Sequence, residues 1–177
     1  GTGMEPGALA LMAFALDGLW HKSKGADGIL THAAYKSFNG VHGAIGKQAE
    51  DTFNGLIEKN EGKRSVFETA LHCVFRELVE VNERGVATRR RASLGQFADD
   101  AMAKGLVNAL TEARLLITGH SKDREPMVEV AHEAIFISWP RLKVWIDDTG
   151  DDLRLRRQVS QAATEWDAQD YDIKYLW

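Results

Sequence analysis

The chain has 177 residues, is 44% hydrophobic and carries a formal net charge of −4, which provides enough apolar material for one domain of ordinary size or two small ones. The acidic balance removes the usual electrostatic argument for nucleic-acid binding, and the single cysteine excludes an internal disulfide and favours a cytoplasmic setting. No apolar run reaches the roughly 18 residues that a membrane span needs, and the opening Gly1-Thr2-Gly3 is typical of an expression remnant, so we expect a segment of a longer protein.

The first half of the chain is predicted to be helical, because its apolar residues recur at helical spacing between polar or glycine-containing breaks. The predicted helices are residues 8–21, a segment that Thr31 opens as N-cap, residues 41–57, and a helix that begins at Ser65. Ser65 and Glu68 have the spacing of a capping box. The apolar run ALHCVF predicts that Cys73 is a small core residue. We therefore predict a helical domain over residues 1–81.

Shorter elements are predicted after a turn at residues 82–85. They are an extended segment at 86–91, a short helix from Ser93, a helix at 101–113, strands at 115–118 and 127–131, and helices at 133–146 and 151–167 on either side of a charged turn. Pro140 lacks an amide donor, which predicts a kink or a new first turn near Trp139. Trp139, Trp145 and Trp166, with leucines between them, are expected to form a core among the last helices.

The order of these elements predicts the fold class. A short helix, a longer helix and a two-stranded hairpin follow one another as in a winged helix-turn-helix, in which the hairpin is the wing. We therefore predict a mainly α fold with a small β-hairpin. Its parts are a helical domain (1–81), a winged-helix domain (82–148) with its wing at about 115–131, and a C-terminal helix (149–177).

The segment GVHGAIGKQAE (residues 40–50) invites comparison with a phosphate-binding loop. Five residues separate Gly40 from Gly46 where a Walker A loop has four, and Gln48 replaces the Ser/Thr that would bind Mg²⁺. We interpret the glycines as positions without a side chain on a helix, which allow another helix to approach it closely. No nucleophile arrangement and no metal-ligand spacing is found elsewhere. The sequence thus predicts no catalytic residues, no metal site and no cofactor held by this segment alone.

Two features carry charge or titratable chemistry. Arg89, Arg90 and Arg91 are able to contact the phosphates of a nucleic acid or a nucleotide, and the alternative is a solvated run or one that forms salt bridges between domains. His132 stands where a predicted strand gives way to an apolar helix, with Glu133 in the first helical turn. Taken alone, that position is typical of a buried, capped structural histidine.

Residues 29–166 resemble the region that follows the ATPase core in bacterial STAND-class proteins (signal-transduction ATPases with numerous domains, NACHT/NB-ARC-like), in the branch that often carries WD40 repeats or other sensor arrays. The resemblance rests on the segments LTHAAYKSFNGVHGAIGKQAE, ATRRRASL, ARLLITG, VEVAHEA with SWPRL, and LRLRRQVSQAATEW. It covers roughly three quarters of the chain. Walker A, Walker B and the sheet that precedes them are absent, so the segment is expected not to be an enzyme, although the parent protein is expected to be an ATPase.

The resemblance implies a helical domain followed by a winged helix that folds over the ATPase core and holds the bound ADP. In the class, a histidine of a Met-His-Asp-like motif contacts the terminal phosphate side of the nucleotide. His132 falls on that position, with Ala131 in place of methionine and Glu133 in place of aspartate. The resemblance therefore implies that His132 senses the nucleotide, which would be ATP or ADP with Mg²⁺ in the parent protein.

Two functional hypotheses follow. The first is a non-catalytic regulatory module of a STAND-type ATPase, which controls autoinhibition and oligomerisation. Its expected partners are the ATPase domain of the same polypeptide, like subunits in a homo-oligomer, and C-terminal sensor repeats, with no membrane and no nucleic acid. The alternative is an autonomous winged-helix DNA-binding domain whose helix at 101–113 enters the major groove. That helix and its end offer only Lys104, Asn108, Glu112 and Arg114 as polar contacts.

Overall fold

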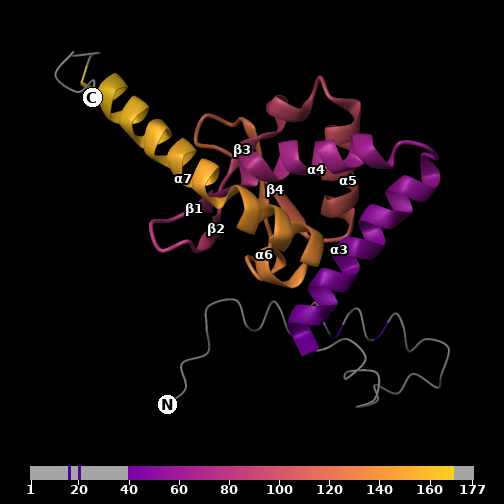
Figure 1. The fold of residues 1–177 in the computed structure, drawn as a ribbon. Helices are drawn as coiled ribbons and strands as arrows, with labels where there is room; N and C mark the ends of the chain where they lie inside the picture. Colours follow the sequence, from indigo (N-terminus) through magenta and orange to yellow (C-terminus); the bar gives the residue numbers. More distant parts are fainter. Residues whose placement is uncertain (1–15, 17–19, 21–39, 170–177) are drawn as a thin grey trace.

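The computed structural model describes residues 16, 20 and 40–169 (Figure 1). Leu16 and Trp20 are helical and exposed. The rest of the predicted helix at 8–21, and the segment that Thr31 was predicted to open, lie outside the described residues.

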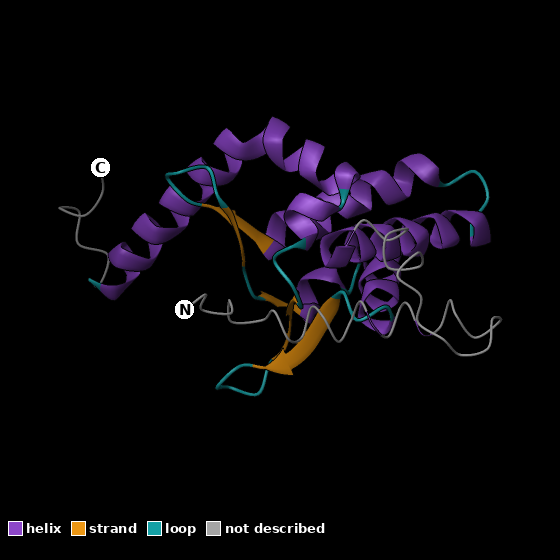
Figure 2. Cartoon of the chain, turned by 90° about the horizontal axis from the view of Figure 1, so that it is seen from below, coloured by secondary structure: helices purple, strands orange, loops and turns teal. Residues whose placement is uncertain are grey.

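The described chain is mainly helical, which confirms the predicted fold class. Its helices are α3 (Gly40–Lys59), α4 (Arg64–Leu78), the 3-10 helix η1 (Leu94–Phe97), α5 (Ala101–Glu112), α6 (Ile135–Ser138) and α7 (Pro140–Ala168). α3, α4, α5 and the first part of α7 enclose the core, and the last turns of α7 project from the body in both ribbon views (Figures 1 and 2). The largest fully buried side chain is Trp139.

The strands form two small antiparallel sheets, which Figure 2 shows as separate orange groups. β1 (Val79–Val81) pairs with β2 (Ala87–Arg89), and β4 (Leu116–His120) pairs with β5 (Pro126–Val130), while β3 (Ala92–Ser93) lies on the other side of β5. The second pair confirms the predicted hairpin. Gly119 and His120, predicted in its loop, extend β4 because they pair with Met127 and Pro126.

The first hairpin was only partly predicted. The turn at residues 82–85 is present, and its geometry depends on Asn82, whose side-chain oxygen accepts hydrogen bonds from the amides of Arg84 (2.9 Å) and Val86 (3.0 Å). Gly85 has φ +77°, which glycine adopts at low cost. β1 was not predicted, because its three residues directly continue the apolar pattern of α4. The predicted domain limits at 81/82 and 148/149 stay a prediction.

Two details of α4 were predicted wrongly. Ser65 does not cap the helix: the N-cap is Lys63, without a side-chain hydrogen bond, and Glu68 bonds to Arg141 instead. Cys73 is exposed rather than buried. The buried positions of α4 recur three or four residues apart on one face, and residue 73 falls outside that face.

The C-terminal helices confirm one prediction and correct another. Pro140 begins α7, directly after the four-residue α6, so the predicted new first turn is present. The predicted charged turn before a separate helix at 151–167 is wrong, because α7 runs without a break to Ala168. Its charged residues support the helix through pairs one turn apart, such as Lys143 with Asp147.

Gly46 allows α3 to lie directly against the end of α6. A Cβ at this position would lie 1.9 Å from the backbone oxygen of Ser138, far inside any van der Waals contact. The prediction that glycine in this helix permits a close approach is therefore confirmed for Gly46. The segment that approaches is the end of α6.

One turn beyond Gly46, Glu50 binds both Trp139 and Arg141. Its carboxylate accepts from Trp139 Nε1 at 2.7 Å and from Arg141 Nη2 at 2.7 Å. Arg141 also donates to Glu68 of α4 at 3.2 Å and lies over the ring of Phe53, 4.7 Å from its centroid. The hydrogen bond from Arg141 holds the pKa of Glu50 below its usual value, although burial acts in the opposite direction. These contacts join α3, α4 and α7.

We predict that Gly46→Ala destabilises the protein by about 1–3 kcal/mol or more, since the new methyl group must displace the Ser138 backbone. Gly55→Ala, in the same helix with open space around its Cα, is the matched control and should stabilise by about 0.5–1 kcal/mol. Urea denaturation measures both free energies of unfolding. Equal effects of the two substitutions would show that the contact at Gly46 is not a packing constraint.

Candidate functional site

His132 lies in the short connection between β5 and α6. The connection is fixed by backbone hydrogen bonds on both sides: the Ala131 amide donates to Leu115 (3.0 Å), and the His132 and Glu133 carbonyls accept from Ile135 (3.1 Å) and Phe136 (3.0 Å). Ile135 and Phe136 are buried in the core immediately afterwards. The strand end and the helix start therefore determine where the His132 side chain emerges.

The neighbouring carboxylate ties this junction to the first hairpin. Glu133 Oε1 accepts a hydrogen bond from the backbone amide of Arg89, the last residue of β2, at 2.9 Å. This contact spans 44 positions of sequence, so no local pattern could have predicted it. The structure thus brings together two of the sequence-predicted site residues, Arg89 and His132.

Two features of the surroundings act on the pKa of His132. Burial lowers the pKa of the half-buried imidazole below its ordinary value of 6.5, and the positive charge of Arg89 lowers it further. A neutral imidazole offers one N–H donor and one acceptor. The exposed Arg89 side chain adds a cation beside it. This junction, defined as Arg89, His132 and Glu133, is suited to binding an anionic group that accepts a hydrogen bond.

The other two arginines of the run face different partners. Arg90 lies 3.7 Å from Glu77 and 3.8 Å from Glu80, both of which belong to the α4–β1 segment. Arg91 donates to Glu129 of β5 at 2.9 Å. Adjacent strand residues point to opposite faces, and the chain turns from β2 into β3 here. The arginine run is therefore divided among three environments, and only Arg89 lies at the junction.

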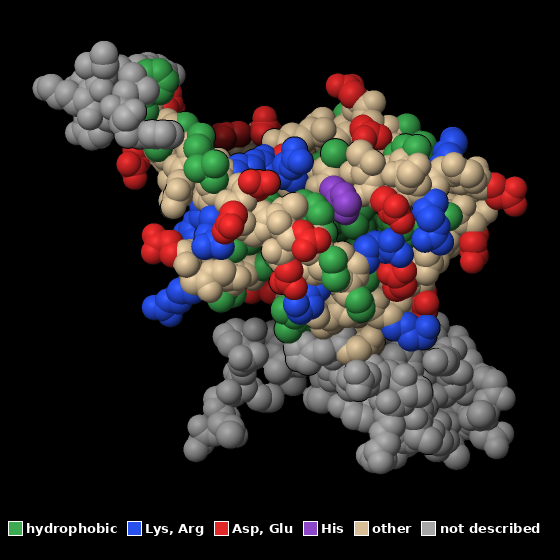
Figure 3. Space-filling model, viewed as in Figure 1, with side chains coloured by type: hydrophobic (Ala, Val, Ile, Leu, Met, Phe, Trp, Pro, Cys, Tyr) green, Lys and Arg blue, Asp and Glu red, His purple; other side chains and the backbone are tan. Residues whose placement is uncertain are grey.

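The exposed face of α5 carries little positive charge. Its exposed residues include Lys104, Asn108 and Glu112, and the exposed Arg114 follows its end, so the helix and its end offer two cations and one anion. Figure 3 shows basic and acidic side chains interspersed over the visible face of the molecule rather than a large basic field. DNA-binding surfaces are strongly positive. The alternative hypothesis of an autonomous DNA reader gains no support from this surface.

Within residues 40–169 and the two isolated described positions, no group of three or more His, Cys, Asp or Glu side chains is placed to hold a metal ion.

None of the helices in the described part of the chain is both long and apolar enough to cross a membrane.

The model of a protein family described as Novel STAND NTPase 1 matches residues 2–174. No curated protein and no solved structure gives a match. The family match covers the junction, both hairpins and every described helix.

We predict that Arg89→Gln raises the pKa of His132, because it removes the adjacent positive charge, but leaves it below 6.5, because burial is the larger cause. The backbone bond to Glu133 is retained in this variant. Arg91→Gln, whose parent side chain pairs with Glu129, is the control and should not move the titration. An NMR titration of the imidazole resonances measures the pKa of His132 in the wild-type protein and in both variants. Equal shifts in both variants would contradict a specific Arg89–His132 interaction.

The lowered pKa also sets the sign of a stability effect. The folded protein binds the His132 proton more weakly than the unfolded chain does, so the stabilisation is complete above pH 6.5 and is lost as the pH falls from there through the lowered folded-state pKa. We predict that His132→Ala makes the free energy of unfolding less dependent on pH in this range. Denaturation curves at several pH values test this, and an unchanged slope would contradict it.

Proposed function

Because the chain belongs to the Novel STAND NTPase 1 family, we propose that it is a non-catalytic regulatory module of a STAND-type signalling ATPase. In this proposal it senses the bound nucleotide and controls autoinhibition and oligomerisation. The observation that carries the proposal is the junction, where a half-buried histidine with a lowered pKa and an exposed arginine are held together by the Glu133–Arg89 bond.

The element order supports a winged-helix interpretation of the second half of the chain. After α4 comes the β1–β2 hairpin, and then β3, η1, α5, β4 and β5 follow in the order strand, two helices and a two-stranded wing. β5 lies between β3 and β4, so the first short strand pairs with the last strand of the wing. In the proposal, this winged helix packs against the ATPase domain of the same polypeptide with the junction toward the nucleotide.

In the proposal, the junction contacts the terminal phosphate of ADP. The imidazole N–H donates to a terminal phosphate oxygen, and Arg89 contributes a positive charge at short range. A bond made only in the closed, ADP-bound state biases a two-state equilibrium by its differential energy, about 1–3 kcal/mol for one charge-assisted bond. Exchange of ADP for ATP with Mg²⁺ changes the phosphate that the histidine meets. Release of the module would then permit assembly of like subunits and a response to C-terminal sensor repeats.

The test uses the longest natural protein that contains this segment. We predict that His132→Ala lowers the amount of co-purified ADP or raises its dissociation constant about tenfold, which corresponds to a loss of about 1.4 kcal/mol, and increases the oligomeric fraction. ADP is quantified by chromatography after denaturation, and the oligomeric state by light scattering.

His120→Ala is the matched control, because His120 is an exposed histidine at the end of β4, in the wing. It should retain ADP and remain in the same state as the wild type. Circular dichroism checks that both variants are folded. If His132→Ala keeps ADP and the same oligomeric state as His120→Ala, His132 has a structural role and the proposed sensing is wrong.

A further inference from the structure

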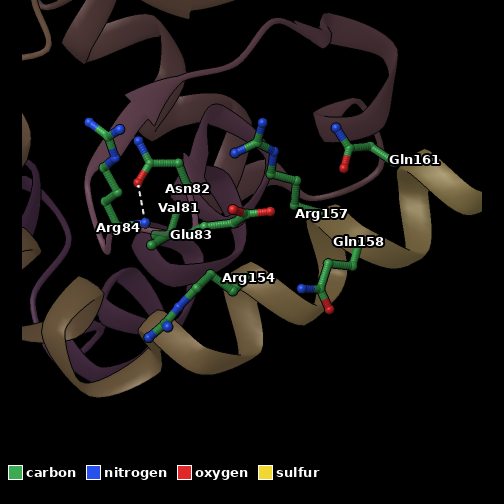
Figure 4. Close-up of a pocket in the computed structure, with 8 residues that line it drawn as sticks. All are labelled: Val81, Asn82, Glu83, Arg84, Arg154, Arg157, Gln158 and Gln161. Carbon is green, nitrogen blue, oxygen red and sulfur yellow. Dashed lines mark hydrogen bonds between the residues drawn. The ribbon is translucent and has the colours of Figure 1, made fainter.

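A groove of about 430 Å³ lies between the turn of the first hairpin and the middle of α7 (Figure 4). The hairpin contributes Asn82, Glu83 and Arg84. α7 contributes Arg154, Arg157, Gln158 and Gln161. None of these residues was predicted to form a site, because the two segments are about 70 positions apart along the chain and form no motif together.

The hairpin side of the groove is a rigid platform. Asn82 fixes the turn by accepting two backbone hydrogen bonds, and the Gly85 amide donates to the Asn82 carbonyl at 2.9 Å. Val81 beneath the turn is buried. Because the turn is fixed, the Glu83 and Arg84 side chains begin from defined positions at the edge of the groove, as Figure 4 shows.

The helix side presents four long polar side chains on one face. Residues 154, 157, 158 and 161 are spaced i, i+3, i+4 and i+7, so they line the same side of α7 over about 10 Å. Arg157 approaches Glu80 at 3.8 Å, and Arg154 pairs with Asp151 at 2.5 Å. This face of α7 therefore presents a row of guanidinium and amide donors. Each of its two arginines forms one ion pair within the protein.

The groove has more donors than its own acceptors use. Arg154 Nε is buried and has no hydrogen-bond partner within the described part of the chain. Among the same residues, the side chains of Arg84, Gln158 and Gln161 have no hydrogen bond or ion pair. Glu83 is the single carboxylate that lines the groove. Asp151 and Glu80 each take up one contact of Arg154 and Arg157, while Arg84, both amides and Arg154 Nε keep donors that no carboxylate uses. This surplus of donors favours a ligand that carries acceptors, such as carboxylates.

The arrangement of these groups selects the class of anion. In Figure 4 the guanidinium groups of Arg84, Arg154 and Arg157 lie apart and do not converge on one point, and that of Arg154 points away from the other two. A single phosphate needs converging donors, whereas carboxylates spaced along a chain meet donors spaced along a helix. Glu83 repels any anionic group placed close to it, but it is able to accept a backbone N–H from a peptide.

We propose that this groove binds an acidic peptide segment that lies along α7 and contacts Arg84 at the hairpin turn and Arg157 on the helix. The carboxylates of the segment pair with the arginines, and the glutamine amides and Glu83 pair with its backbone. This binding site is separate from the junction at His132, and it does not depend on the proposed nucleotide sensing.

The probe is fluorescein-labelled hexaglutamate, titrated by fluorescence anisotropy into the 177-residue chain at about 0.15 M salt, where distant surface charges are screened. Labelled hexaglutamine controls for the label and the backbone. We expect hexaglutamate to bind, and Arg84→Gln to weaken its binding about tenfold. Arg157→Gln should weaken it as well, provided that circular dichroism shows the variant to be folded.

Arg64→Gln is the matched control, because Arg64 is an exposed arginine in the first turn of α4 and its loss changes the net charge equally. It should leave the affinity unchanged. Equal weakening by Arg64→Gln and Arg84→Gln would mean non-specific attraction and overturn the proposal. Absence of hexaglutamate binding would overturn it too. Displacement of the peptide by equimolar inorganic phosphate would overturn the proposal and show that the groove is a site for simple anions.

Discussion

The contact between Gly46 and Ser138 is the constraint on which the arrangement of the helices depends. A Cβ at position 46 would lie 1.9 Å from the backbone oxygen of Ser138, so glycine at this position allows α3 and the end of α6 to approach this closely. Glu50 is one helical turn further along the same face. The close approach therefore brings its carboxylate to Trp139 and Arg141, where three hydrogen bonds connect the two segments.

The same contact determines the position of the junction at His132. Ser138 ends α6, and α6 is only four residues long, so it has little freedom to move relative to the residues before it. β5 holds the other side through its pairing with β4. The Glu50–Arg141 pair is partly buried, and such a pair contributes more to specifying one arrangement than to net stability, because desolvation offsets much of its attraction. Its role here is to fix α7 relative to α3 and α4.

Local patterns in the sequence predicted the helices and the second hairpin, because apolar periodicity follows directly from burial on one face. They failed where the outcome depends on distant residues. The charged residues 147–152 are typical of a turn, but i,i+4 pairs and the anchoring of Trp145 and Leu153 on the body keep α7 helical. Glu68 has the spacing of a capping residue, yet Arg141 from 73 positions away binds it. The Arg89–Glu133 bond and the groove are equally non-local. The sequence therefore named only His132 and the arginine run as candidate site residues, and their role stays a prediction.

The hairpin of β1 and β2 connects the groove with the junction at His132. Its turn carries Arg84 at the groove, and its end carries the Arg89 amide that binds Glu133 beside His132. β1 and β2 are paired over their whole length, from Val79 with Arg89 to Val81 with Ala87, and the Arg90 amide donates to Leu78 just beyond. The Glu133–Arg89 bond ties the end of this hairpin to the residue beside His132, so one paired unit joins the groove to the junction.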